Sequence, residues 1–140
     1  METQARDRKR IRVILAILGL DQHETGALSV AATLRDAGME VVYLGRFASP
    51  ESVAAAAFEE SADVVGISCH SWEYLHYLDD LLRGLVREDE RIPLMIGGSI
   101  ISPSEKARLL EKGVSAVFGA GAANDEIVIA VRRLAAGSLN

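Results

Sequence analysis

The chain has 140 residues, of which 49% are hydrophobic, and both numbers are typical of a single folded domain with a sizeable core. Its formal net charge of -5 provides no basic surface for nucleic acid, and its single cysteine excludes an internal disulfide bond. The apolar run after Arg10 is too short to span a bilayer. We therefore expect a cytoplasmic protein that binds neither nucleic acid nor membrane, with residues 1–10 as a charged flexible arm and residues 11–140 as the domain.

Short apolar runs alternate with amphipathic segments along the whole domain. The runs predict buried strands, and the amphipathic segments, two of which open with a serine followed by proline, predict helices. Such alternation favours a parallel sheet with helices on both faces, so we predict a flavodoxin-like (Rossmann-like) doubly wound α/β fold with five strands in the order 2-1-3-4-5. The expected strands are residues 11–19, 41–44, 63–68, 92–96 and 114–118, and the expected helices are residues 27–37, 50–61, 72–87 (with an apolar stripe of Leu75, Leu78, Leu82 and Leu85), 102–113 and 124–136.

A polar segment follows the first strand, at the crevice where this fold binds its ligands. A neutral imidazole binds a metal through one nitrogen, while the other nitrogen usually donates to a carboxylate. His23 is therefore a candidate metal ligand, with Asp21 as its hydrogen-bond partner and Gly26 leaving space for a bulky ligand. Taken alone, such a pair is also typical of a helix N-cap followed by a surface histidine. The whole segment reads Asp21, Gln22, His23, Glu24, Thr25, Gly26.

Other proteins with this architecture carry different residues at the strand ends. A phosphorelay receiver has a phosphorylatable Asp after the third strand and a Lys after the fifth, where this chain has Ser68 and Gly119. A flavodoxin has a hydroxyl-rich phosphate loop after the first strand, and residues 21–24 have the wrong charge for a phosphate. A dinucleotide-binding domain needs Gly-x-Gly-x-x-Gly there, and only Gly19 and Gly26 occur.

Three motifs in order resemble those of cobalamin-binding domains. Residues 21–26 match Asp-x-His-x-x-Gly, residues 68–70 correspond to Ser-x-Leu after the third strand, and Gly97-Gly98 follows the fourth strand. The similarity extends over nearly all of the chain from about Ile11, and its flanking segments look like those of acyl-CoA mutases. The chain departs from the pattern where His70 replaces the Leu of Ser-x-Leu and where Ile17 replaces a Lys found in many acyl-CoA mutases.

The resemblance implies a role for each motif residue. His23 would displace the dimethylbenzimidazole of the cofactor and become the lower axial ligand of cobalt, with Asp21 holding the far nitrogen. The displaced nucleotide tail would enter the crevice, with Ser68 hydrogen-bonded to its base. A side chain at the glycines of the crevice would fill that space, although some of them are also consistent with simple tight turns. The implied cofactor-binding residues are Asp21, Gln22, His23, Glu24, Thr25, Gly26, Ser68, His70, Gly97, Gly98, Gly119 and Gly121.

Residues around the second motif leave several interpretations open. His70 could contact the corrin or its tail, face a partner protein or cap the following helix, and we expect the cap. Trp72 and Tyr74 belong to an aromatic cluster that is more typical of core packing than of a cofactor contact, although either could lie at an interface. Cys69 is expected to be a small buried hydrophobic residue.

The resemblance further implies that this chain is the small subunit of an adenosylcobalamin-dependent carbon-skeleton mutase, an isomerase with radical chemistry. The substrate would be an acyl-CoA. A separate TIM-barrel large subunit would cover the corrin, so we expect a hetero-oligomer in which this chain is inactive alone and provides no catalytic residue beyond the cobalt ligand. The alternatives are the small subunit of an amino-acid mutase such as glutamate mutase, a corrinoid methyl carrier, and a cobalamin sensor or storage module.

Overall fold

The computed structural model describes residues 10–19, 23–119 and 121–138. Its centre is a five-stranded parallel sheet with the strand order β2-β1-β3-β6-β7. This arrangement confirms the predicted doubly wound fold, with β6 and β7 as the expected fourth and fifth strands. The strands are β1 (Arg12–Leu18), β2 (Glu40–Ala48), β3 (Val64–Ser68), β6 (Leu94–Gly97) and β7 (Ala116–Phe118).

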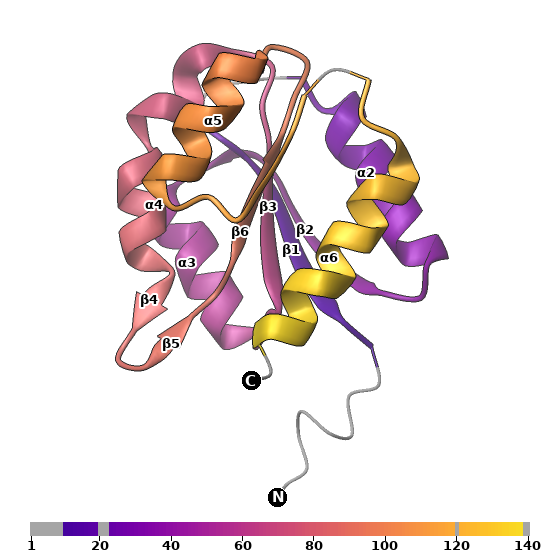
Figure 1. The fold of residues 1–140 in the computed structure, drawn as a ribbon. Coiled ribbons are helices and arrows are strands. Elements are labelled where there is room, and N and C mark those ends of the chain that lie inside the picture. The colour runs from indigo at the N-terminus through magenta and orange to yellow at the C-terminus, as the bar shows by residue number, and fades with distance from the viewer. Residues whose placement is uncertain (1–9, 20–22, 120, 139–140) are drawn as a thin grey trace, which may run out of the picture.

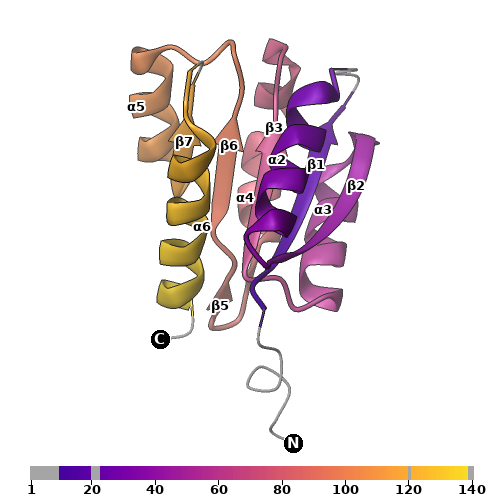
Figure 2. The same cartoon turned by 90° about the vertical axis from the view of Figure 1, so that its right-hand side faces the viewer.

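Helices cover both faces of the sheet, as Figures 1 and 2 show. The helices α2 (Thr25–Asp36) and α6 (Asn124–Ser138) lie on one face, and α3 (Pro50–Glu59), α4 (Leu78–Gly84) and α5 (Pro103–Lys112) lie on the other. Successive strand residues point to opposite faces, so each strand contributes to two separate clusters of buried side chains. In β1, for example, Leu15 packs on the face of α2 and α6, whereas Ile14 packs on the face of α3, α4 and α5.

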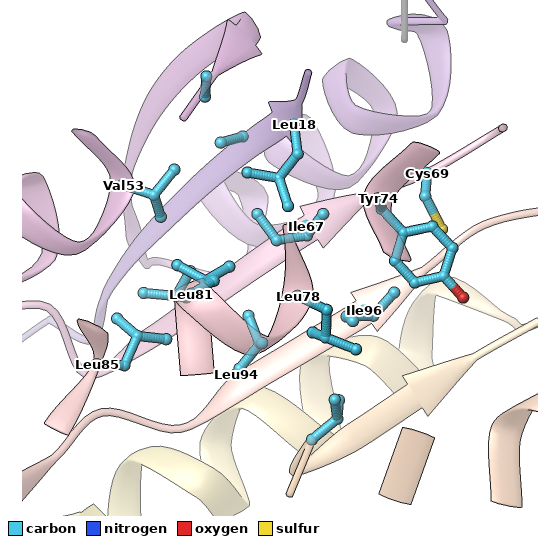
Figure 3. Packing of buried hydrophobic residues seen from close by; sticks show 14 of the residues in the cluster. Leu18, Val53, Ile67, Cys69, Tyr74, Leu78, Leu81, Leu85, Leu94 and Ile96 are labelled. Atoms are coloured by element: carbon cyan, nitrogen blue, oxygen red, sulfur yellow. The ribbon is translucent and has the colours of Figure 1, made fainter. Parts of the chain in front are cut away.

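The larger cluster lies under α3, α4 and α5 (Figure 3). Tyr74 is its largest fully buried side chain, and the ring lies beside Cys69, which is itself 1% exposed. Cys69 is therefore a buried small hydrophobic residue, as its sequence context predicts. Burial raises the pKa of the Tyr74 hydroxyl, and the nearby Cys69 and Glu105 raise it further.

Local signals in the sequence define several helix ends. The Ser49 hydroxyl accepts a hydrogen bond from the backbone N–H of Ser52, and the Ser102 hydroxyl accepts one from Glu105. A proline follows each capping serine at the first helical position. Gly113 ends α5 with a φ of +114°, a conformation that residues with a side chain rarely adopt. These boundaries match the predicted ones because each depends on only a few neighbouring residues.

The predicted single helix over residues 72–87 is wrong. The chain forms a 3₁₀ helix, η1 (Trp72–His76), then the short α4, and then a hairpin of β4 (Val86–Arg87) and β5 (Glu90–Arg91). The tighter winding of a 3₁₀ turn shifts the phase of the apolar stripe. Leu75 is consequently exposed, and Tyr74 occupies the core position that was expected for Leu75.

Two further boundaries differ from the predicted ones near the crevice. Helix α2 begins at Thr25 rather than at Ala27. Strand β2 extends to Ala48, well beyond the four residues expected, because two register shifts against β1 let it follow that strand to its end. Gly45 and Phe47 both adopt positive φ in this irregular stretch.

Of the expected charged arm, only Arg10 lies within the described residues. Within residues 10–19, 23–119 and 121–138, none of the helices has the length and apolar character needed to cross a membrane.

Candidate cofactor site

A cavity of about 260 Å³ lies between α2 and α6, over the carboxyl ends of the central strands. Its sheet side is apolar and includes Leu15 of β1 and Met95 of β6, and Ile127 of α6 closes it from the helix side. Hydroxyl, amide and imidazole groups lie among its lining residues as well. The polar lining residues are Ser29, Ser68, His70, Ser99 and Asn124.

The residues of β3 reach this cavity through the alternation of a strand. Val65 and Ile67 belong to the cluster on the far face, so Gly66 and Ser68 face the helices α2 and α6. The backbone N–H of Cys69 donates to the carbonyl of Gly97 at 2.9 Å and keeps the chain in register with β6 beyond the end of β3. His70 therefore continues the same alternation and lines the cavity too.

His23 lies between the end of β1 and the start of α2, and its side chain is exposed. Its ring centroid is 5.4 Å from that of His70, with the two ring planes tilted by 33°. The exposed imidazole is thus presented next to the cavity. The predicted partner Asp21 and the neighbouring Gln22 lie outside the described residues, so their roles stay predictions.

Glu24 anchors the first turn of α2 to strand β2. The Tyr43 hydroxyl donates to Glu24 Oε2 at 2.6 Å, and Arg46 Nε lies 3.7 Å from Glu24 Oε1. Burial raises the pKa of Tyr43 to about 12, and the hydrogen bond to Glu24 and the negative charge of that carboxylate act in the same direction, against a smaller opposite effect of Arg46. Glu24 therefore holds the loop that bears His23, while Thr25 at the first position of α2 is exposed.

Replacing Tyr43 by phenylalanine should lower the free energy of unfolding by about 1 kcal/mol at neutral pH, since it removes one hydrogen bond to a carboxylate. The pKa is higher in the folded than in the unfolded state, so this stabilisation is complete below pH 10.0 and is lost as the pH rises towards about 12. Urea unfolding of both proteins at neutral and alkaline pH measures the difference. If the difference in free energy of unfolding between the two proteins stayed constant from neutral to alkaline pH, the Tyr43 proton would contribute nothing to stability.

Two glycines provide space where a side chain would meet the cavity wall. A Cβ atom on Gly26 would lie 3.1 Å from His70 Cε1 and 3.7 Å from Ser68 Oγ. A Cβ atom on Gly97 would have Phe118 as its nearest neighbour, at 3.7 Å. Both glycines line the cavity, and their contact with a cofactor stays a prediction.

The glycines after β7 line the cavity as well. A Cβ atom on Gly119 would come within 2.8 Å of the Ile101 carbonyl oxygen, so this position also packs against backbone. Gly121 has a φ of +86° and open space around it. The turn alone therefore accounts for Gly121, which is one of the two interpretations that the sequence left open.

At Gly98 the structure adds a packing constraint to the predicted role in the cofactor site, which stays a prediction. A Cβ atom there would lie 1.8 Å from the carbonyl oxygen of Cys69 and 2.8 Å from its Sγ atom. The backbone N–H of Gly98 also donates to the Phe118 carbonyl at 3.0 Å. Gly98 lines the cavity, and a glycine is also required here because two backbone segments touch at this point.

The expectation that His70 caps the following helix is wrong. The N-cap residue of η1 is Ser71, and it makes no side-chain capping bond, whereas His70 points across the crevice towards Gly26. Of the neighbouring aromatic residues, Trp72 is 53% exposed and Tyr74 is buried. Of these two residues, Trp72 therefore keeps the surface position that an interface residue needs.

Sequence reasoning missed the residues that α2, α6 and the turn before α6 contribute to the site. These residues match no metal-binding or catalytic motif, and the amphipathic pattern marks only which side of a helix faces the sheet. The first turns of α2 and α6 adjoin the strand ends in this fold, and that position was the available signal. The missed lining residues include Ala27, Ser29, Val30, Ala122, Asn124 and Ile127.

The chain is thus an α/β protein of the doubly wound class, with a cavity at the strand ends, where this class binds its ligands, and an exposed imidazole beside it. The B12 binding domain family matches residues 11–129. This chain therefore belongs to the B12-binding domain family, whose members bind cobalamin.

Several known proteins are similar to this chain. The pivalyl-CoA mutase small subunit of Xanthobacter autotrophicus is 39% identical over 124 residues, which cover 89% of this chain and 83% of that protein. The 2-hydroxyisobutanoyl-CoA mutase small subunit of Aquincola tertiaricarbonis is 34% identical over 93% of this chain and 96% of that protein. Among solved structures, a cobalamin-binding protein from Desulfitobacterium hafniense has a TM-score of 0.75 at 21% identity, over 90% of this chain and 60% of that one, and so shares the fold.

Proposed function

We propose that this chain is the cobalamin-binding small subunit of an adenosylcobalamin-dependent acyl-CoA mutase. The observation that carries the proposal is the exposed imidazole of His23 next to the cavity between α2 and α6. The similarity to small subunits of two acyl-CoA mutases supports it, because each of those relatives is similar to this chain over most of both lengths.

The cavity fits the nucleotide tail of a cobalamin whose base has left the cobalt. Its apolar residues, Leu15, Met95 and Ile127, suit an aromatic base. Its hydroxyl and amide groups suit the ribose and phosphate, and Ser68 would bond to a nitrogen of the base. Gly26 and Gly97 keep the walls free of side chains where the tail would pass.

His23 would be the ligand that the protein provides to the cobalt. Because the cofactor brings most of the metal's ligands itself, a single imidazole from the protein is enough. Glu24, fixed by Tyr43 and Arg46, would keep the His23 loop at the edge of the cavity, and Asp21 would accept a hydrogen bond from the far imidazole nitrogen. When bound, adenosylcobalamin supplies a weak cobalt–carbon bond whose homolysis starts a radical rearrangement.

The substrate would bind to a larger partner. The similar proteins are named small subunits, which supports a hetero-oligomer with a large mutase subunit, and we propose a TIM barrel for that subunit. In such a complex this chain positions the cofactor and is inactive alone. The names of those relatives favour an acyl-CoA over an amino acid as substrate, and they favour a mutase over a methyl carrier or a sensor.

A titration with adenosylcobinamide tests the cofactor part of the proposal. This corrinoid lacks the nucleotide tail and so has no lower base of its own. Binding should shift its visible absorption as the cobalt acquires a nitrogen ligand from the protein. Binding without any such shift would contradict ligation by His23.

Reconstitution tests the mutase part. The chain, loaded with adenosylcobalamin, is mixed in separate reactions with the large subunit of an acyl-CoA mutase, offered pivalyl-CoA or 2-hydroxyisobutanoyl-CoA, and with the large subunit of glutamate mutase, offered glutamate. We expect rearrangement of an acyl-CoA only. Turnover of glutamate would favour the amino-acid mutase, and binding of cobalamin without turnover in any combination would favour a sensor or storage module.

A further inference from the structure

We infer that His70 contacts the nucleotide tail of the bound cobalamin and gives this chain a preference for corrinoids that carry a tail. The inference rests on the proposed function. It concerns a position at which this chain departs from the resembling family, where a leucine occupies the place of His70.

The position of His70 follows from backbone geometry. The hydrogen bond from Cys69 N–H to the Gly97 carbonyl, at 2.9 Å, continues the pairing of β3 with β6 past Ser68. Cys69 is consequently buried on the far face, and the next side chain turns towards α2 and α6. His70 lies on the same side of the sheet as Ser68, and both line the cavity.

The ring of His70 lies beside the first turn of α2. Its Cε1 and Nε2 atoms would be 3.1 and 3.6 Å from a Cβ atom on Gly26, where the Ser68 hydroxyl oxygen would be 3.7 Å away. On the other side, the His23 ring lies 5.4 Å from the His70 ring, centroid to centroid. His70 therefore lies beside the proposed cobalt ligand and, unlike His23, forms part of the cavity wall.

The chemistry of an imidazole suits contact with a heteroaromatic base. Its planar ring can stack on another ring, and its two nitrogens can donate and accept hydrogen bonds. A leucine at the same place would offer only apolar contact. The imidazole is thus able to recognise nitrogen and oxygen atoms of a tail that enters the cavity, together with Ser68.

The test compares hydroxocobalamin with diaquocobinamide, which lacks the tail, by absorbance titration of the full chain. The affected quantity is the ratio of the two dissociation constants. Free cobalamin must release its base from cobalt before it can bind, and the free energy of this step is the same for every protein variant. It therefore cancels when the variants are compared. We expect His70→Leu to weaken cobalamin binding by about fivefold, the factor of one ordinary hydrogen bond, and to leave cobinamide binding unchanged.

Three further variants make the test specific. His70→Gln keeps a donor and an acceptor at a similar reach and should restore most of the preference for cobalamin. His76→Leu changes an exposed histidine of η1 outside the cavity lining and should alter neither constant. Gly26→Ala adds a methyl 3.1 Å from His70 Cε1 inside the cavity and should weaken the binding of cobalamin more than that of cobinamide, while urea unfolding confirms that each variant is folded.

The outcomes separate this inference from the proposed function. Equal weakening of both corrinoids in His70→Leu would show that His70 acts through His23 or through the fold, and would overturn the inference. If His70→Leu bound both corrinoids as tightly as the wild type does, the inference would be overturned, but the proposed function would not, because the wild type would still bind cobalamin. A wild-type chain that binds neither corrinoid would contradict the proposed function, and the inference with it.

Discussion

Replacing His23 by alanine is expected to weaken cobalamin binding by at least about 100-fold. Loss of a residue that only hydrogen-bonds to a metal ligand already lowers metal affinity by up to about 100-fold, and loss of the ligand itself should have at least that effect. The fold should persist. His23 is exposed, lies before the first turn of α2 and does not line the cavity, so its removal leaves both hydrophobic clusters unchanged. Mutase activity with a large subunit should disappear together with axial ligation.

Electron paramagnetic resonance of the cob(II)alamin form measures the ligation directly. An axial nitrogen splits the cobalt lines, and protein grown with heavy-nitrogen histidine changes that splitting only if the nitrogen comes from the protein. The label-sensitive splitting should be present in the wild type and in His76→Ala, and absent in His23→Ala, where any remaining nitrogen splitting comes from the base of the cofactor itself. A label-sensitive splitting that survives in His23→Ala would assign the ligand to another histidine, and His70 would be the first to examine because of its position beside His23.

Replacing Gly98 by alanine is expected to destabilise the domain by about 3 kcal/mol or more. The added methyl would meet the Cys69 carbonyl oxygen at 1.8 Å, and no side-chain rotation can relieve a clash with backbone. Separation of the two segments would strain the hydrogen bond from Cys69 N–H to Gly97 and the one from Gly98 N–H to Phe118. The ends of β3, β6 and β7 would therefore move together.

Gly97→Ala is the matched control for this substitution. Its methyl would be no closer than 3.7 Å to any neighbour, so the free energy of unfolding should change by less than about 1 kcal/mol. Because Gly97 lines the cavity, the methyl should reduce the affinity for cobalamin and spare that for cobinamide. Urea unfolding compares the two variants, and equal stability of Gly98→Ala and Gly97→Ala would refute the packing argument.

Local patterns account for the features that sequence reasoning predicted correctly. The apolar run of β1, the Ser-Pro starts of α3 and α5, and Gly113 at the end of α5 each depend on residues close in the chain. The alternation of strands and helices then leaves few compact arrangements, and the observed order β2-β1-β3-β6-β7 is the one expected for this length.

The errors arose where distant contacts compete with local preference. Residues 72–87 carry a helical apolar pattern, yet a Cβ atom on Gly19 would meet Tyr77 at 2.7 Å and Glu73 at 3.1 Å, so η1 is packed closely over the end of β1. Val86 and Arg87 pair with Arg91 and Glu90 in a hairpin, and the sequence between the two strands contains no strong turn motif that would have predicted it. Helical periodicity describes one face of a segment and contains no information about such neighbours.

Residue types and spacings along the chain were enough to predict the class of fold, the family and the positions of the motifs, because each of these depends on local patterns. The surroundings of several motif residues became visible only in the folded domain. Tertiary structure turned His70 into the cavity through the pairing of Cys69 with Gly97, and it made Gly98 a point of backbone contact with Cys69. Both outcomes depend on distances between segments that are far apart in sequence, and those distances exist only once the strands have paired.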